Sequence, residues 1–325
     1  MAKHALAKGG PMMSKPELIL MGEYAATDMA VLESHYIVHR YWEAVDKGAF
    51  LARHAGTVRA LATRGDLGAS QGVINALPKL ELICCFGVGV DAIDLIAAKA
   101  RGIKVTTTPN VLNEDVADLA LALMLGIARQ IPQADAFTRS GAWAKGNFPL
   151  LTRMNGKRLG ILGLGRIGMA IARRAEGFSM PVAYCTRSKR GDVGYQRYTN
   201  AAELAAHSDF LVAILPGGDA TAKIVNADVL KALGPKGFFI NVARGSVVDE
   251  PALLHALETK AIAGAALDVF WNEPKIDTRF FSLQNVVLHP HGGSGTSETR
   301  AAMGKLVRDN LAAFFVGQPL LSPIK

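Results

Sequence analysis

Three side chains in the second half of this 325-residue sequence could together bind and protonate a small anionic substrate. Arg244, Glu273 and His291 each follow a short apolar run. An arginine can bind a carboxylate through two parallel hydrogen bonds, and a histidine beside an acid can deliver a proton near neutral pH. Each residue alone could be a surface arginine, a loop acid or a structural histidine. Together they are the set that reduction of a keto acid needs.

A glycine motif lies upstream of these residues. Residues 158–168 read RLGILGLGRIG, so Gly163, Gly165 and Gly168 form G-x-G-x-x-G between an apolar strand and a helix. Such glycines allow a tight turn, close approach of a pyrophosphate and close packing of helix on strand. The free N–H groups at the helix start, around Arg166 and Ile167, would bind the anion. A turn without a ligand is the alternative, but the strand–turn–helix context favours a dinucleotide.

The next strand end predicts which dinucleotide is bound. An enzyme specific for NAD places an acid about 20 residues after the glycines, where it binds the ribose hydroxyls. This sequence has no acid there and instead reads Thr186, Arg187, Ser188 and Lys189. Arginine forms charge-assisted hydrogen bonds to a phosphate, which a carboxylate would repel. We therefore expect NADP(H) to be preferred over NAD(H). Solvated loop charges would explain the arginine but not the missing acid.

These residues require parallel sheets that bring strand ends to one edge. Short apolar runs alternate with helical patterns along the chain, which predicts an α/β protein with two doubly wound parallel-sheet domains. In such sheets ligands bind beyond the carboxyl ends of the strands. The expected strands are 17–21, 36–40, 58–63, 82–85, 104–106, 158–163, 181–185, 209–215, 238–242, 262–268 and 286–288.

The last helix predicts how the domains are connected. The helix at 297–315 has no strand after it in its own block, so we expect it to return to the first domain. The cofactor domain, 110–290, is then inserted in a substrate domain formed by 14–109 and 291–325. The chain would cross between them near Pro109 and Pro290. Residues 1–13 are interpreted as a disordered leader.

Composition narrows the possible partners. The net charge is +8, and 145–197 alone hold eleven Lys or Arg against two acids. This basic segment coincides with the glycine motif, so an anionic cofactor is a better partner for it than nucleic acid. No apolar run reaches the ~18 residues that cross a membrane. Three cysteines, Cys84, Cys85 and Cys185, suggest neither disulfides nor a metal site, so a reducing cytoplasm is expected.

The sequence resembles the D-isomer-specific 2-hydroxyacid dehydrogenase family over nearly all of its length after the leader. It is most similar to the branch of hydroxypyruvate, glyoxylate and hydroxyphenylpyruvate reductases. The segments FGVGVDAIDL, TTTPNVLNEDVADLAL, LGILGLGRIG, INVARGSVVDE, AALDVFWNEP and LHPHGGSGT give this resemblance. The resemblance implies a Rossmann cofactor domain inserted in a split flavodoxin-like substrate domain. It also implies a homodimer in which the cofactor domains are in contact.

The resemblance assigns roles by motif. Arg244, Glu273 and His291 match the catalytic residues, and Arg244 and His291 also bind substrate. His289 is expected to be a structural neighbour, because the family's histidine follows the proline. Val88 and Gly89 also match, and their backbone N–H groups would bind the substrate carboxylate. Asp268 matches the residue that would hold the nicotinamide carboxamide. Pro216 and Val242 would contact the cofactor.

Two positions depart from the family pattern. Leu215-Pro216-Gly217-Gly218 stands where many relatives have Pro-Leu-Thr, which puts that loop's cofactor contacts in doubt. Gly292 follows the histidine where a larger residue is common, and we expect it to open the pocket.

The predicted function is NADPH-dependent reduction of small 2-keto acids to D-2-hydroxy acids. A formate dehydrogenase on the same scaffold is one alternative, but it would pair its histidine with glutamine, where this sequence has Glu273. A dinucleotide-sensing corepressor or scaffold is the other. Such proteins usually have a long disordered tail, whereas this sequence ends soon after its last helix.

Overall fold

The structure is a computed structural model, and it describes residues 15–324. The leader predicted at 1–13 lies outside the described residues. The chain divides into two compact units. Unit 1 is Met1–Pro109 with Ala301–Lys325, and unit 2 is Asn110–Arg300.

Unit 1 contains a sheet of five parallel strands in the order β2-β1-β3-β4-β5. Along β1, Leu18 and Leu20 face one side of the sheet while Ile19 faces the other, and all three are fully buried. Both faces are therefore covered, as expected for strands with apolar residues at successive positions. The strands are β1 Glu17–Leu20, β2 Ile37–Arg40, β3 Ala60–Arg64, β4 Leu82–Phe86 and β5 Lys104–Thr106.

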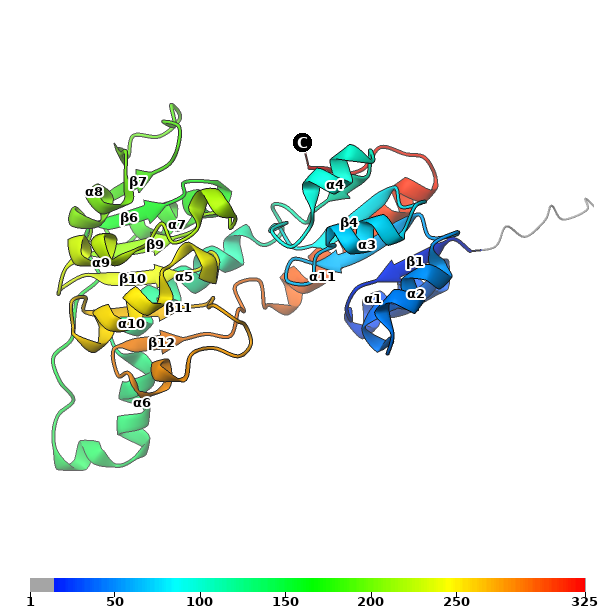
Figure 1. The fold of residues 1–325 in the computed structure, drawn as a ribbon. Helices are drawn as coiled ribbons and strands as arrows, with labels where there is room; N and C mark the ends of the chain where they lie inside the picture. Colours follow the sequence, from blue (N-terminus) through cyan, green and yellow to red (C-terminus); the bar gives the residue numbers. More distant parts are fainter. Residues whose placement is uncertain (1–14, 325) are drawn as a thin grey trace, which may run out of the picture. The chain divides into compact units, whose positions relative to one another are not determined.

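Helices cover the two faces of the unit 1 sheet (Figure 1). One face packs against residues of α1 (Ala26–His35) and α11 (Ser297–Phe315), among them Leu32, Val307 and Leu311. Asp28 of α1, buried, pairs with Arg308 of α11, which joins the two helices on that face. The other face packs against α2 (Lys47–His54), α3 (Gln71–Ala76) and α4 (Leu95–Ala100).

Unit 2 contains a sheet of seven parallel strands in the order β12-β11-β10-β9-β6-β7-β8. The chain starts in the middle at β6, runs outward through β7 and β8, and then crosses to β9. This reversal of strand order is the point where doubly wound sheets bind dinucleotides. The strands are β6 Leu159–Leu162, β7 Val182–Cys185, β8 Gln196–Tyr198, β9 Phe210–Ala213, β10 Phe238–Asn241, β11 Gly264–Leu267 and β12 Val286–Leu288.

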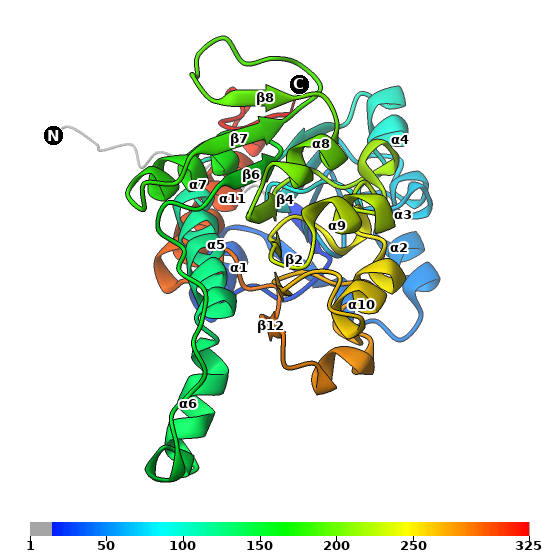
Figure 2. The ribbon, with the colours of Figure 1, turned by 90° about the vertical axis from the view of Figure 1, so that its left-hand side faces the viewer.

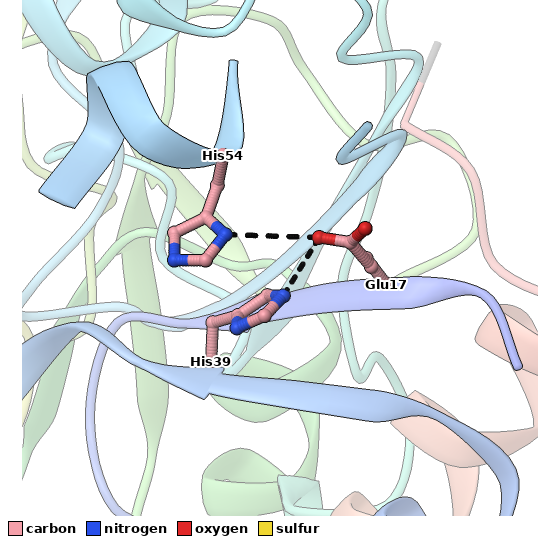
Figure 3. Close-up of side chains that lie close together, drawn as sticks. All are labelled: Glu17, His39 and His54. Atoms are coloured by element: carbon pink, nitrogen blue, oxygen red, sulfur yellow. Dashed lines mark hydrogen bonds and ion pairs between the residues drawn. The ribbon is translucent and has the colours of Figure 1, made fainter. Parts of the chain in front are cut away.

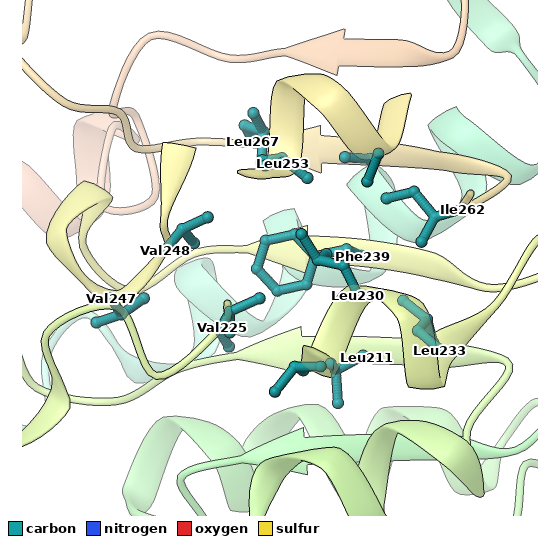
Figure 4. Close-up of a cluster of buried hydrophobic side chains, with 14 of the residues drawn as sticks. Leu211, Val225, Leu230, Leu233, Phe239, Val247, Val248, Leu253, Ile262 and Leu267 are labelled. Carbon is teal, nitrogen blue, oxygen red and sulfur yellow. The ribbon is translucent and has the colours of Figure 1, made fainter. Parts of the chain in front are cut away.

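One large apolar cluster packs against one face of the unit 2 sheet. Its centre is Phe239 of β10, surrounded by residues of the neighbouring strands and helices such as Leu211, Leu230 and Leu253 (Figure 4). All four are at most 1% exposed, so they give the strand ends a rigid base. The helices on this face are α8 Ala201–Ala206, α9 Ala227–Leu233 and α10 Glu250–Glu258.

Two long helices of unit 2 contact each other, and a third helix follows one of them along the chain. α5 (Asn113–Ala128) contacts α7 (Arg166–Glu176) and the strands β10, β11 and β12. α6 (Ile131–Arg139) continues beyond it and extends away from the sheet (Figures 1 and 2). None of the residues of α6 is buried.

The α/β fold class with two parallel sheets is confirmed, and every strand expected from the sequence is present. The structure adds β8, which the sequence analysis missed because Gln196-Arg197-Tyr198 is short and has no apolar alternation. As an edge strand it needs no fully buried face. Within residues 15–324, no helix is both long and apolar enough to cross a membrane.

Candidate active site

The glycine motif of unit 2 forms a turn that leaves room above the start of a helix. Gly163 follows β6 with a φ of +99°, and a Cβ there would lie 2.7 Å from the Ile214 carbonyl oxygen. A Cβ on Gly168 would lie 2.3 Å from the Gly163 oxygen, so helix and strand approach closely. At Gly165, by contrast, a Cβ would meet nothing within 4 Å. The motif therefore combines a tight turn with open space, which fits a bound pyrophosphate.

The start of α7 has free hydrogen-bond donors. Gly165 is its N-cap and supplies no side-chain hydrogen bond to it. Within residues 15–324 the first N–H groups of the helix, at Arg166 and Ile167, have no acceptor, which leaves them available to an anion.

The loop after β7 presents basic side chains to solvent. Arg187, Ser188 and Lys189 are exposed. Thr186 Oγ1 donates to the Ser188 carbonyl oxygen over 2.6 Å, which tightens the loop. Within residues 15–324 the guanidinium of Arg187 has no hydrogen-bond or ion-pair partner, whereas Arg190 is paired with Asp192.

Arg197 is a residue of this region that sequence reasoning missed. Its Nη2 donates to the carbonyl oxygens of Thr186 and Arg187, each at 3.0 Å, and its Nε is buried without a partner among the described residues. Arg197 thus fixes the backbone of the basic loop. An arginine twelve residues beyond the β7 end, within an otherwise polar stretch, is the only signal for this contact in the sequence.

Much of the basic segment at 145–197 is neutralised by acids. Arg158 pairs with Asp209 at 2.9 Å, and Arg174 pairs with Glu114 at 2.7 Å and with Asp118 at 2.6 Å. The segment is therefore less basic than its composition indicates, and Arg187 and Lys189 stand out as the loop cations.

Arg244 is positioned by buried neighbours at the end of β10. The Asn241 side chain, 1% exposed, accepts from Ala243 N and donates to the Arg244 carbonyl oxygen, both over 3.0 Å. A Cβ on Gly245 would lie 2.0 Å from the Phe270 carbonyl oxygen, so only glycine allows the two loops to meet. The Trp271 Nε1 then donates to the Gly245 oxygen over 3.0 Å. The arginine loop and the loop before Glu273 are thus packed together.

Glu273 and His291 form a direct pair. His291 Nδ1 donates to Glu273 Oε2 over 2.5 Å, while Glu273 Oε1 accepts from Phe270 N over 2.8 Å. The backbone N–H of His291 donates to the Asp268 carbonyl oxygen over 2.8 Å, and its φ is +48°. Because Nδ1 binds the acid, Nε2 is on the opposite side of the ring, and the side chain is 45% exposed.

The charges in this pair favour its ionised form. The hydrogen bond to Glu273 raises the pKa of His291, and although burial opposes this, the charges of Glu273 and Asp268 add to the rise. Burial would raise the pKa of Glu273, but the hydrogen bonds from His291 and Phe270, with the charges of His291 and Arg244, lower it overall. Arg244 is close enough to act on both groups. The three residues therefore form one electrostatic unit.

Asp268 is a buried member of the predicted set. Its side chain is 3% exposed and accepts from Gly292 N and His289 Nδ1 through Oδ1, and from Gly293 N through Oδ2. Its carboxylate therefore holds the turn that carries His291.

The expectation that Gly292 opens the pocket is wrong. A Cβ there would lie 2.4 Å from His289 Cε1, because the imidazole ring of His289 occupies that space. The glycine accommodates a neighbouring side chain and leaves no added room for a ligand.

Val88 and Gly89 lie in unit 1, in the loop after β4. The Gly87 N–H donates to Thr108 Oγ1 over 3.0 Å, and Cys85 Sγ donates to the Gly89 oxygen over 3.4 Å, so the loop is held from both sides. Among the described residues neither the Val88 nor the Gly89 N–H has an acceptor, which leaves both available to an anion.

Every predicted residue of unit 2 follows the carboxyl end of a strand in one parallel sheet. Pro216 follows β9, and Val242 follows β10. A sheet with a helix-start anion site and an arginine, acid and histidine at the same edge defines a dinucleotide-dependent oxidoreductase.

Comparison with known proteins identifies the family. Residues 121–293 match the D-isomer specific 2-hydroxyacid dehydrogenase family, NAD binding domain. The chain is 48% identical over 293 residues to hydroxyphenylpyruvate reductase of Plectranthus scutellarioides, covering 90% of this chain and 94% of the other. The chain therefore belongs to the D-isomer specific 2-hydroxyacid dehydrogenase family, and it is an enzyme.

Two solved structures are similar over almost the whole chain. A 2-hydroxyacid dehydrogenase from Ketogulonicigenium vulgare Y25 superposes with a TM-score of 0.91 at 49% identity, covering 96% of this chain and 99% of that one. The NADPH-dependent glyoxylate/hydroxypyruvate reductase from Sinorhizobium meliloti, in complex with NADP and malonate, gives 0.90 at 43%, covering 96% and 97%. Both agree with the family assignment and with the fold.

Proposed function

We propose that this enzyme uses NADPH to reduce small 2-keto acids, such as glyoxylate and hydroxypyruvate, to D-2-hydroxy acids. The observation that carries the proposal is the 2.5 Å contact between His291 Nδ1 and Glu273 Oε2, at the sheet edge that also presents Arg244. The Sinorhizobium meliloti relative, which is NADPH-dependent and named for glyoxylate and hydroxypyruvate, supports the choice of substrate and cofactor.

The residues present fit a nicotinamide dinucleotide. The open space at Gly165 and the free N–H groups of α7 accept a pyrophosphate, and Arg187 with Ser188 and Lys189 would hold a 2′-phosphate. Asp268, Pro216 and Val242 lie at the strand ends where the nicotinamide half would bind. When bound, the reduced nicotinamide supplies the hydride that the keto carbon receives.

The protein's own residues supply binding, orientation and the proton. Arg244 would bind the substrate carboxylate and carbonyl oxygen, which fixes the face of the carbonyl and stabilises developing negative charge. The Val88 and Gly89 N–H groups would bind the carboxylate as well. The protonated His291, oriented by Glu273, would donate its Nε2 proton to the alkoxide oxygen as that oxygen gains charge.

The Glu273 carboxylate distinguishes this reaction from formate oxidation. Formate oxidation releases carbon dioxide and leaves no alkoxide, so it requires no proton donor. Here the carboxylate raises the pKa of His291 by its hydrogen bond and so keeps a proton on the ring.

A panel of keto acids tests the proposal. Purified enzyme should consume NADPH with glyoxylate and hydroxypyruvate. The glycerate formed from hydroxypyruvate is chiral and should be the D isomer by chiral chromatography. Comparing kcat/KM for the bulkier hydroxyphenylpyruvate with the values for the two smaller keto acids shows how large a substrate side chain the site accepts. Absence of turnover with all three, or formate-dependent reduction of NADP+, would contradict it.

We also propose that the enzyme is a homodimer in contact through the cofactor domains. The support is apolar surface on the extended stretch after α5, where Ile131 is 53%, Trp143 66% and Leu150 102% exposed. Such apolar exposure is typical of a protein interface. Light scattering should give twice the chain mass, and Trp143→Glu should lower it, whereas the chain mass in the unaltered protein would refute a dimer.

A further inference from the structure

Three side chains of unit 1 converge on one point far along the chain from the residues discussed above (Figure 3). Glu17 comes from β1, His39 from β2 and His54 from α2. His39 Nε2 lies 2.8 Å from Glu17 Oε2, and His54 Nδ1 lies 3.7 Å from the same oxygen. The three ligand atoms all lie within 4.8 Å of one another.

The two imidazole rings are held against each other by packing. Their centroids are 3.7 Å apart with an interplanar angle of 29°, and Phe50 packs against His54 at 4.9 Å between centroids. Thr57 Oγ1 donates to Glu17 Oε2 over 2.8 Å, which orients the carboxylate. The side chains are only 14–23% exposed, so their conformations are restrained before any ligand arrives.

These three side chains are better arranged to bind one metal cation than to carry a positive charge on each imidazole ring. Two imidazolium charges stacked this closely would repel each other, whereas a single divalent ion can bind both ring nitrogens and the carboxylate at once. Two ligands about 2.1 Å from a tetrahedral ion are roughly 3.4 Å apart. The separations of 2.8 and 3.7 Å from Glu17 Oε2 lie on either side of that value.

We propose that Glu17, His39 and His54 bind a divalent transition-metal ion, with Zn²⁺ the best match to two imidazoles and one carboxylate. His39 and Phe50 also line a surface depression of about 430 Å³. Arg40 lines the same depression, but it is paired with Glu33 and Glu43, so its charge is balanced. The ion would join β1, β2 and α2, a structural function separate from catalysis.

Zinc titration of the whole enzyme tests the site. We expect isothermal titration with ZnCl₂ to give one site, and His39→Ala, His54→Ala and Glu17→Gln each to weaken it about tenfold or more. Zn²⁺ should also raise the Tm of the unaltered enzyme but not that of Glu17→Gln, a change that keeps the shape of the side chain. Circular dichroism of each variant checks that it is folded.

Two further histidine variants show whether zinc binds at this cluster or at another histidine. His255 is exposed on α10 and serves as a matched surface control, and its replacement by alanine should leave zinc affinity unchanged. His291→Ala should also retain the site, which excludes binding at the His291–Glu273 pair. The proposal is overturned if Zn²⁺ does not bind, or if its affinity is the same in the three cluster variants as in the unaltered enzyme.

Discussion

Arg197 Nη2 donates to the carbonyl oxygen of Arg187 over 3.0 Å, so one arginine fixes the backbone of another that faces solvent. If Arg187 binds the 2′-phosphate, Arg187→Ala should raise the KM for NADPH roughly tenfold to hundredfold, because a charge-assisted contact contributes ~1.5–3 kcal/mol. The KM for NADH should stay nearly the same. Steady-state kinetics with both cofactors measures this, and an equal rise in both would mean that Arg187 does not recognise the phosphate.

Arg197 should act through that loop. Arg197→Ala removes two hydrogen bonds to carbonyl oxygens and leaves the loop free to move, so the KM for NADPH should rise while kcat changes little. In the double variant with Arg187→Ala, the two effects should not add, since both report on one contact. Full additivity would show that Arg197 does not position Arg187.

The His291–Glu273 pair should set the pH dependence of keto-acid reduction. The hydrogen bond to Glu273 raises the pKa of His291, and the proton-donating form exists below that pKa. Reduction should therefore decline as pH rises through the raised pKa. Glu273→Gln keeps the shape but removes the charge, so the declining limb of kcat/KM should move to lower pH. An unmoved limb would show that Glu273 does not tune the histidine.

The two histidines around Pro290 should differ in effect. His291→Ala should reduce kcat by ~10²–10⁴-fold, the usual contribution of a general acid, while NADPH binding followed by fluorescence persists. His289 donates to Asp268, whose Oδ1 also accepts from Gly292 N, so His289→Ala should be much less damaging. Equal losses in two folded variants would mean that the proton donor has been misassigned.

Alanine substitutions at two glycines should have different effects, one on stability and the other on cofactor binding. A Cβ on Gly245 would lie 2.0 Å from the Phe270 oxygen, so Gly245→Ala should lower the free energy of unfolding in urea by about 1–3 kcal/mol. Gly165 has nothing within 4 Å, so Gly165→Ala should keep that stability yet weaken NADPH binding, because the methyl group enters the space for the pyrophosphate. A stability loss at Gly165 equal to that at Gly245 would contradict this distinction.

Sequence alone determined the order of the elements and the family. α11 runs from Ser297 to Phe315, and β12 from Val286 to Leu288, as their patterns indicated. Periodicity is a local property, and motifs such as G-x-G-x-x-G act within a few residues, so both can be recognised without the fold. The parallel sheet then places residues that follow strand ends, such as Arg244 and His291, at one edge.

Only the tertiary structure decided which side chains from different elements contact one another. That Arg197 fixes the loop of Arg187 and that Glu17 meets His39 and His54 are contacts across different elements. Such contacts depend on strand register and on how a helix packs over a sheet. No spacing along the chain reveals them, because side chains distant in sequence become neighbours only when the core is packed.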